Sequence, residues 1–183
     1  MNFFELINRR ESVRDYNPNQ TINKDVLNKI INAGRIAPSA ANKQPWKFLV
    51  ISSEKMLNKV RPCYNREWFN DAPHILIVVG DKNNSWIRQS DGYNSLETDL
   101  TIAMDHMILA AEAKNIGTCW IAAFDNDILR NALQLKENQI VYSITPLGYQ
   151  NKEYKRKDKK IRKPKASRAR SREVYVYGLA FVG

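Results

Sequence analysis

The pattern of apolar and polar positions predicts a mixture of helices and strands along the chain. Helical spacing of apolar residues predicts helices over residues 2–10, 23–35, 54–60, 96–115 and 127–133. Runs of β-branched and other apolar residues predict strands over 46–51, 75–80, 118–124, 140–145 and 174–182. Because these elements are mixed without strict strand–helix–strand repetition, the predicted fold class is α+β rather than a doubly wound parallel sheet.

Two segments predict the centre of this fold. The run ILIVVG at 75–80 is continuously apolar, as expected for a central strand that is covered on both faces. The middle of the helix over 96–115 is apolar almost all round, which is typical of a helix inside a core or at a subunit interface. We expect Gly117 to close this helix, and Pro38 to end the helix that Thr21 or Asn23 caps.

Length and composition favour one soluble domain over residues 1–183. Hydrophobic residues make up 43% of the 183 positions and charged residues 26%, which are ordinary values for a globular protein. Glu5 and Asn8 interrupt the early apolar stretch, so we expect no secretory signal, and no window is long enough to predict a membrane helix. Two cysteines do not form a disulfide framework, and we therefore expect a cytoplasmic protein.

The net charge of +10 is concentrated in one segment near the C-terminus. Residues 151–172 hold 12 Lys and Arg against two acidic residues, whereas the rest of the chain holds 17 basic and 17 acidic residues. Such a segment is either an exposed loop or an attraction for anionic partners. Nucleic-acid binding is disfavoured as the main function because interleaved aromatic residues are missing, although Tyr154 is present.

The sequence contains no recognisable catalytic or metal-binding framework. It has no glycine-rich dinucleotide fingerprint, no phosphate-binding P-loop and no nucleophile–histidine–acid set. His74 and His106 are far apart along the chain, and we expect no metal site. If the protein is an enzyme, a bound organic cofactor therefore supplies the reactivity.

Four segments are candidates for binding such a cofactor. In Arg10-x-Ser12-x-Arg14, alternation places two guanidiniums and a hydroxyl on one side, which suits a phosphate; the alternative is a solvated helix end. The small residues of APSAANKQPW at 37–46 suit a flat ring, or else form an ordinary connection. The strand end at 146–149 is a ligand site or a simple turn, and the arginine repeat at 168–172 is a phosphate contact or a solvated tail.

Taken together, these segments resemble the nitroreductase family of FMN enzymes. RRESVRDY resembles the family's R-x-S-x-R motif, and APSAANKQPWKFLVI is similar to its second signature. NDAPHILIVVGD, TIAMDHMILAAEAKNIGTCWIAAF and ITPLGYQ follow in the family's order, and SREVYVYG resembles its C-terminal end. The resemblance covers nearly the whole chain.

The resemblance implies a fold, an assembly and an activity. The expected fold is a central, mostly antiparallel sheet flanked by helices in an intertwined homodimer, with residues 151–172 and 174–182 packing on the partner. The expected activity is ping-pong: NADH or NADPH reduces FMN at N5 by hydride, and an electron-poor acceptor such as a nitroaromatic or a quinone is then reduced in the same site. The alternatives are dehydrogenase, reductive dehalogenase or flavin-processing chemistry on the same fold.

The resemblance also implies roles for particular residues. Arg10 and Ser12 meet the FMN phosphate and ribityl chain, and Arg14 lies at the pyrimidine edge, where it stabilises charge on the reduced ring. The remaining expected contacts are Pro38, Ser39, Asn42 and Gln44, partly from the partner, with Asn65, Pro146, Leu147, Gly148, Arg168 and Arg170. Glu11, also within the motif, is likewise expected among the cofactor-binding residues; it stands where many relatives have a second arginine, and it lowers the positive field beside the phosphate. Trp68 stands where some relatives have a lysine.

Overall fold

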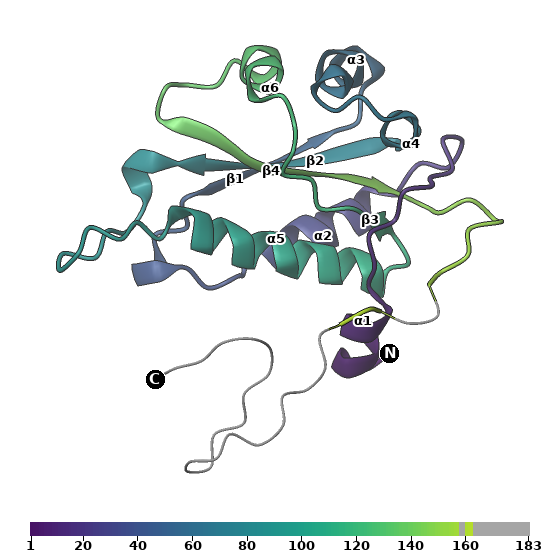
Figure 1. The fold of residues 1–183 in the computed structure, drawn as a ribbon, viewed down its shortest axis with the longest axis horizontal. Helices are drawn as coiled ribbons and strands as arrows, with labels where there is room; N and C mark the ends of the chain where they lie inside the picture. Colours follow the sequence, from purple (N-terminus) through teal and green to yellow (C-terminus); the bar gives the residue numbers. More distant parts are fainter. Residues whose placement is uncertain (158–159, 163–183) are drawn as a thin grey trace, which may run out of the picture.

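The computed structural model describes residues 1–157 and 160–162 and contains helices on both faces of one sheet (Figure 1). Its strands are β1 (Trp46–Ile51), β2 (His74–Asp81), β3 (Gly117–Thr118) and β4 (Gln139–Gly148). Its α-helices are α1 (Phe3–Arg9), α2 (Lys24–Arg35), α3 (Glu54–Val60), α4 (Glu67–Asn70), α5 (Leu96–Ala113) and α6 (Asn126–Leu133). Short 3₁₀ turns are η1 (Ala40–Asn42), η2 (Arg61–Cys63) and η3 (Lys82–Asn84).

The four named strands form an antiparallel sheet in the order β1-β2-β4-β3. Side chains of the central strand β2 alternate between two hydrophobic layers, because successive residues of a strand face opposite sides. Ile75 and Ile77 pack on the side of α3 and α6, whereas Leu76 and Val78 pack on the side of α2 and α5 (Figure 1). The predicted α+β class, with an antiparallel sheet flanked by helices, is confirmed.

Helix α5 lies across one face of the sheet and packs closely against α2. A Cβ atom at Gly34 of α2 would lie 2.8 Å from the side chain of Met107, so glycine permits this close approach. The helix ends at Ala113, and the left-handed residue that follows is Asn115, at φ 60°. The prediction that Gly117 closes the helix is therefore wrong, since Gly117 lies in β3.

The predicted strand over 118–124 is also wrong, because pairing stops after Thr118. Continuing the register of Gly117 with Gly148 and Thr118 with Leu147 would bring Cys119 opposite Pro146. Proline has no N–H to donate, so the ladder is interrupted there, and the Cys119 N–H instead donates to Oγ1 of Thr145 at 3.0 Å. Pairing resumes only as a single bridge between Ile121 and Ile144.

The other predicted elements agree with the structure to within a few residues. The segments 46–51 and 54–60 coincide with β1 and α3, and the side chain of Asn23 caps α2. The predicted strand over 174–182 lies outside the described residues. None of the helices in the described part of the chain is both long and apolar enough to span a membrane.

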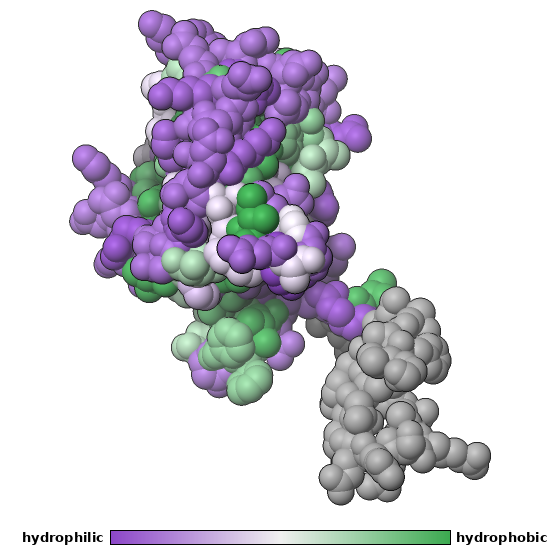
Figure 2. Space-filling model, turned by 90° about the vertical axis from the view of Figure 1, so that its left-hand side faces the viewer, coloured by the Kyte–Doolittle hydropathy of each residue, from purple (hydrophilic) through white to green (hydrophobic). Residues whose placement is uncertain are grey.

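Helix α1 leaves two large apolar side chains uncovered in the single chain. Phe3 is 60% exposed and Phe4 72%. Figure 2 shows hydrophobic residues gathered at the bottom of the described body, the level at which Figure 1 places α1.

Candidate functional site

The N-terminal motif is held beside β3 by backbone pairing and by a buried tyrosine. Ser12 forms a parallel bridge with Thr118, and the Val13 N–H donates to the Thr118 carbonyl at 2.8 Å. Tyr16, which is fully buried, donates its hydroxyl to the Val13 carbonyl at 2.8 Å. The backbone that carries Arg10, Ser12 and Arg14 is thus fixed by the core.

These side chains line a cavity of about 340 Å³ whose other wall comes from the basic segment. Five cationic side chains surround it together with one carboxylate and one hydroxyl: the lining residues are Arg10, Glu11, Ser12, Arg14, Lys157, Lys160, Ile161 and Arg162. Burial, with Arg10 and Arg162 nearby, lowers the pKa of Lys160. So many converging donors and positive charges suit a phosphate or another multivalent oxyanion.

The described part of the basic segment is packed against the N-terminal motif. The Asn151 amide donates to the Tyr16 carbonyl at 3.0 Å, and the Tyr154 hydroxyl donates to Oε1 of Glu11 at 3.1 Å. Sequence reasoning placed the phosphate contacts of this segment at Arg168 and Arg170, which lie outside the described residues. It missed Lys157, Lys160 and Arg162, for which the density of positive charge was the available signal.

A buried carboxylate on α5, that of Glu112, pairs with α1 and with the basic segment. Glu112 is 1% exposed, and its side chain pairs with Arg9 at 2.7 Å and with Arg156 at 3.0 Å. Arg156 also donates to the Arg9 carbonyl at 3.2 Å. Burying one carboxylate between two guanidiniums offsets its desolvation and ties α1, α5 and the basic segment together.

The loop over 37–46 is shaped by backbone strain and held by a second buried carboxylate. Ala41, Asn42 and Gln44 have φ angles of 49°, 52° and 48°, in the left-handed region that most residues avoid. Asp99 of α5, 2% exposed, accepts the Ala40 N–H at 2.9 Å. Such strain persists only where surrounding contacts enforce it, and it is common at ligand sites.

Within that loop, the predicted ligand residues point their polar groups at one another and outward. The Gln44 N–H donates to Oγ of Ser39 at 2.9 Å, and the Gln44 amide donates to Oδ1 of Asn42 at 3.0 Å. Pro38, Asn42 and Gln44 are exposed, so the loop presents a preformed polar surface.

The loop and the cationic pocket do not meet within one chain. Their anchors, Asp99 and Glu112, belong to opposite ends of α5, and 13 residues of helix span about 20 Å. Figure 1 shows η1 near one end of α5 and α1 near the other. One chain therefore presents two separate halves of the predicted site.

The segment Pro146-Leu147-Gly148 lies inside β4 and is buried, so the alternative of a simple turn is wrong. A Cβ atom at Gly148 would lie 2.9 Å from Cδ1 of Tyr16 and 3.0 Å from Cδ of Pro73. Glycine is required here by the packing of Tyr16.

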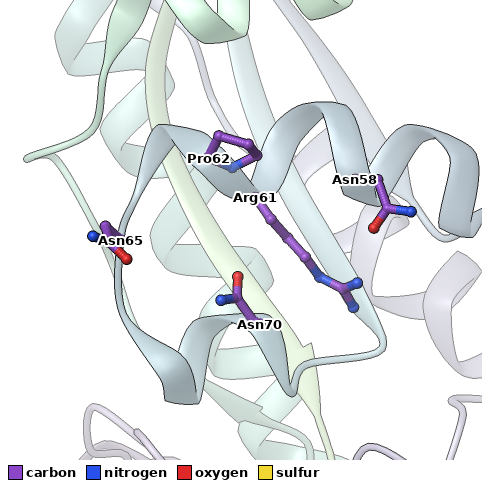
Figure 3. Close-up of a pocket in the computed structure, with 5 residues that line it drawn as sticks. All are labelled: Asn58, Arg61, Pro62, Asn65 and Asn70. Atoms are coloured by element: carbon purple, nitrogen blue, oxygen red, sulfur yellow. The ribbon is translucent and has the colours of Figure 1, made fainter.

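Asn65 lies on a different surface from the cationic pocket. It lines a hollow of about 590 Å³ beside η2 and α4, together with Asn58, Arg61, Pro62 and Asn70 (Figure 3). Its neighbour Trp68 does contact the N-terminal motif, since the Arg14 guanidinium carbon lies 5.9 Å from the centroid of the Trp68 ring. The unusual Trp68 thus helps to place Arg14 by a cation–π contact.

His74 and Cys119, two further titratable side chains, are buried. Burial lowers the pKa of His74, whose Nε2 accepts the Ile22 N–H at 3.1 Å. Burial raises the pKa of Cys119, although the charge of Arg14 and the nearby Ser12 hydroxyl lower it. Among the residues that the structure describes, no group of His, Cys, Asp and Glu could hold a metal ion.

Comparison with known proteins identifies the family to which this helix-flanked antiparallel sheet with its cationic pocket belongs. A family model described as "Nitroreductase family" matches residues 7–63 and 58–149. The chain belongs to the nitroreductase family.

Individual relatives agree over most of their length. An Archaeoglobus fulgidus protein, named as a candidate NADH dehydrogenase/NAD(P)H nitroreductase, is 31% identical over 150 residues, covering 79% of this chain and 83% of that protein. A solved nitroreductase family protein from Clostridium difficile 630 is 35% identical, with a TM-score of 0.78 over 83% of this chain and 86% of that one. A Bacteroides fragilis nitroreductase with bound FMN shares the fold, at 24% identity and a TM-score of 0.72 over 92% of this chain and 100% of that one.

Proposed function

We propose that this protein is an FMN-dependent oxidoreductase that uses NADH or NADPH as its electron donor. The observation that carries the proposal is the pocket in which Arg10, Ser12 and Arg14 face Lys157, Lys160 and Arg162. Its cations match the two negative charges of a phosphate monoester, and its hydroxyl adds a hydrogen-bonding partner. The names of the relatives support the nicotinamide donor.

The residues of this chain bind and orient the cofactor, and FMN, when bound, supplies the hydride chemistry. Arg10 and Ser12 hold the phosphate end. Arg14, placed by the Trp68 ring, would be the residue at the pyrimidine edge, where a preorganised cation would stabilise negative charge without reorganisation. The acceptor that such chemistry would serve is an electron-poor molecule such as a nitroaromatic or a quinone.

We also propose that the working unit is a homodimer. The loop over 37–46 and the pocket are anchored at opposite ends of α5, at Asp99 and Glu112, about 20 Å apart along the helix, so one chain does not bring the exposed amides of the loop to the pocket. A second copy supplies this loop to the pocket of the first. The exposed Phe3 and Phe4 of α1 support burial against such a copy.

The test measures FMN affinity in apo-protein by quenching of flavin fluorescence. Arg10→Ala should weaken FMN binding by about 2 kcal/mol, the value of one charge-assisted contact. Lys55→Ala, which removes a charge on the exposed side of α3, serves as the control. Wild-type protein that takes up no FMN, or unchanged affinity in Arg10→Ala, would contradict the proposal.

Anaerobic reduction with each nicotinamide, followed by reoxidation against nitroaromatic, quinone and halogenated acceptors, separates the possible reactions. A nitroaromatic or quinone as the fastest acceptor supports the proposed activity. A single halogenated substrate that outcompetes them would favour reductive dehalogenation on the same fold.

A further inference from the structure

Glu11 is an unexpected residue beside a site for an anion, because a carboxylate repels a phosphate. It is 9% exposed, and both of its oxygens are in use. Oε1 accepts the Tyr154 hydroxyl at 3.1 Å, and Oε2 accepts the Lys157 N–H at 3.2 Å. Arg156 lies 3.8 Å from the same carboxylate.

These contacts hold the chain at the point where the basic segment reaches the pocket. Lys157 follows Arg156 directly in the chain. The Lys160 ammonium donates a hydrogen bond to the Ile7 carbonyl of α1. Arg156 is held on its other side by Glu112 at 3.0 Å. The cations of the second pocket wall are therefore carried by a stretch whose position depends on two carboxylates.

The same carboxylate acts on a crowded cluster of positive charge. Arg10, Arg14, Lys157, Lys160 and Arg162 line one cavity and repel one another before any anion binds. Burial and the charge of Glu11 raise the pKa of Tyr154 to about 12, so its hydroxyl remains a donor at neutral pH.

We propose that Glu11 is a positioning residue for the phosphate of the cofactor: it latches residues 154–157 to the N-terminal motif so that Lys157, Lys160 and Arg162 face the pocket. This inference rests on the proposed function, since it takes FMN as the occupant. Relatives with an arginine at this position have one cation there directly. Glu11 instead holds in place a segment that carries several cations.

The latch and a purely electrostatic role predict opposite signs. If Glu11 acted only through its charge, Glu11→Gln would remove a repulsion and tighten FMN binding. If Glu11 holds the segment, Glu11→Gln weakens FMN binding, because the contacts with Tyr154, Lys157 and Arg156 lose the negative charge of the carboxylate. Riboflavin, which lacks the phosphate, separates an effect on the phosphate contact from an effect on the ring.

The experiment titrates full-length apo-protein with FMN and with riboflavin. Glu11→Gln should raise the Kd for FMN about tenfold, the loss of roughly one charged hydrogen bond, and leave the Kd for riboflavin within about twofold. Tyr154→Phe keeps the Glu11 charge and removes one donor, so it should raise the Kd for FMN several-fold. Glu153→Gln, an exposed carboxylate on the same segment, is the matched control and should change neither value.

Three other outcomes would contradict the role of Glu11 or the proposed function. An FMN Kd that falls or stays unchanged in both Glu11→Gln and Tyr154→Phe overturns the latch, and so does a parallel loss of riboflavin affinity. If Arg10→Ala still weakens FMN binding, only the latch is wrong. If Arg10→Ala also has no effect, the pocket does not bind FMN and the proposed function fails with it.

Discussion

Asp99 supports the strained loop over 37–46, and its removal should destabilise both the fold and the site. Its two carboxylate oxygens accept the Ala40 N–H and the Ser95 hydroxyl, each at 2.9 Å, from a side chain that is 2% exposed. Hydrogen bonds to a charged acceptor contribute about 1.5–3 kcal/mol each. Because Ala40 is only partly buried and water can replace part of the loss, we expect Asp99→Ala to cost about 2–4 kcal/mol.

Asp99→Asn provides a graded comparison. Its carbonyl oxygen still accepts the Ala40 N–H, and its amide can donate to the Ser95 hydroxyl, which then acts as acceptor. Both contacts survive without charge, so the cost should be about 1 kcal/mol. Urea unfolding followed by tryptophan fluorescence measures both values.

The loss should extend to the site because three left-handed residues of the loop, Ala41, Asn42 and Gln44, follow this anchor closely. Turnover with saturating nicotinamide should fall in Asp99→Ala more than in Asp99→Asn. A free energy of unfolding within about 0.5 kcal/mol of wild type in Asp99→Ala would refute the anchoring role. Equal losses in the two variants would show that the charge, rather than the hydrogen bonds, matters.

Two further changes test the packing around the motif and the buried histidine. Gly148→Ala places a Cβ against Tyr16 and Pro73, so urea unfolding should show a loss of about 1–3 kcal/mol; wild-type stability would show that Tyr16 can move freely. His74 has a lowered pKa in the folded state, so its contribution is fully present above the unfolded pKa of about 6.5 and is lost as pH falls below it. The free energy of unfolding should therefore decline below pH 6.5 less steeply in His74→Gln than in wild type, and parallel pH profiles would exclude His74 as the cause.

The local elements were predictable because their signals lie within short windows. Trp46–Ile51 and Glu54–Val60 were found at their observed bounds, and Asn23 was one of the two predicted caps of α2. The strand over 118–124 failed for a non-local reason: Pro146, far along the chain, interrupts its pairing. A short apolar run carries no information about which distant residue will lie opposite it in the sheet.

Part of the candidate site was predictable in the same way. The spacing of Arg10, Ser12 and Arg14 left an anion site and a solvated helix end open, and the resemblance to the family favoured the anion site and supplied the loop over 37–46. The pocket wall that contains Lys157, Lys160 and Arg162 was not found, because its position depends on contacts with Glu11 across 143 and 146 positions of the chain.

The sequence by itself therefore determined the fold class, the family and the first half of the proposed phosphate site, since periodicity and ordered motifs are properties of neighbouring residues. Only the tertiary structure decided what Glu11 and the basic segment do. From the sequence alone, a carboxylate among arginines and a run of lysines are each compatible with several roles. Their meaning depends on burial and partners: Glu11 and Glu112 are buried, and each holds the basic segment against the motif.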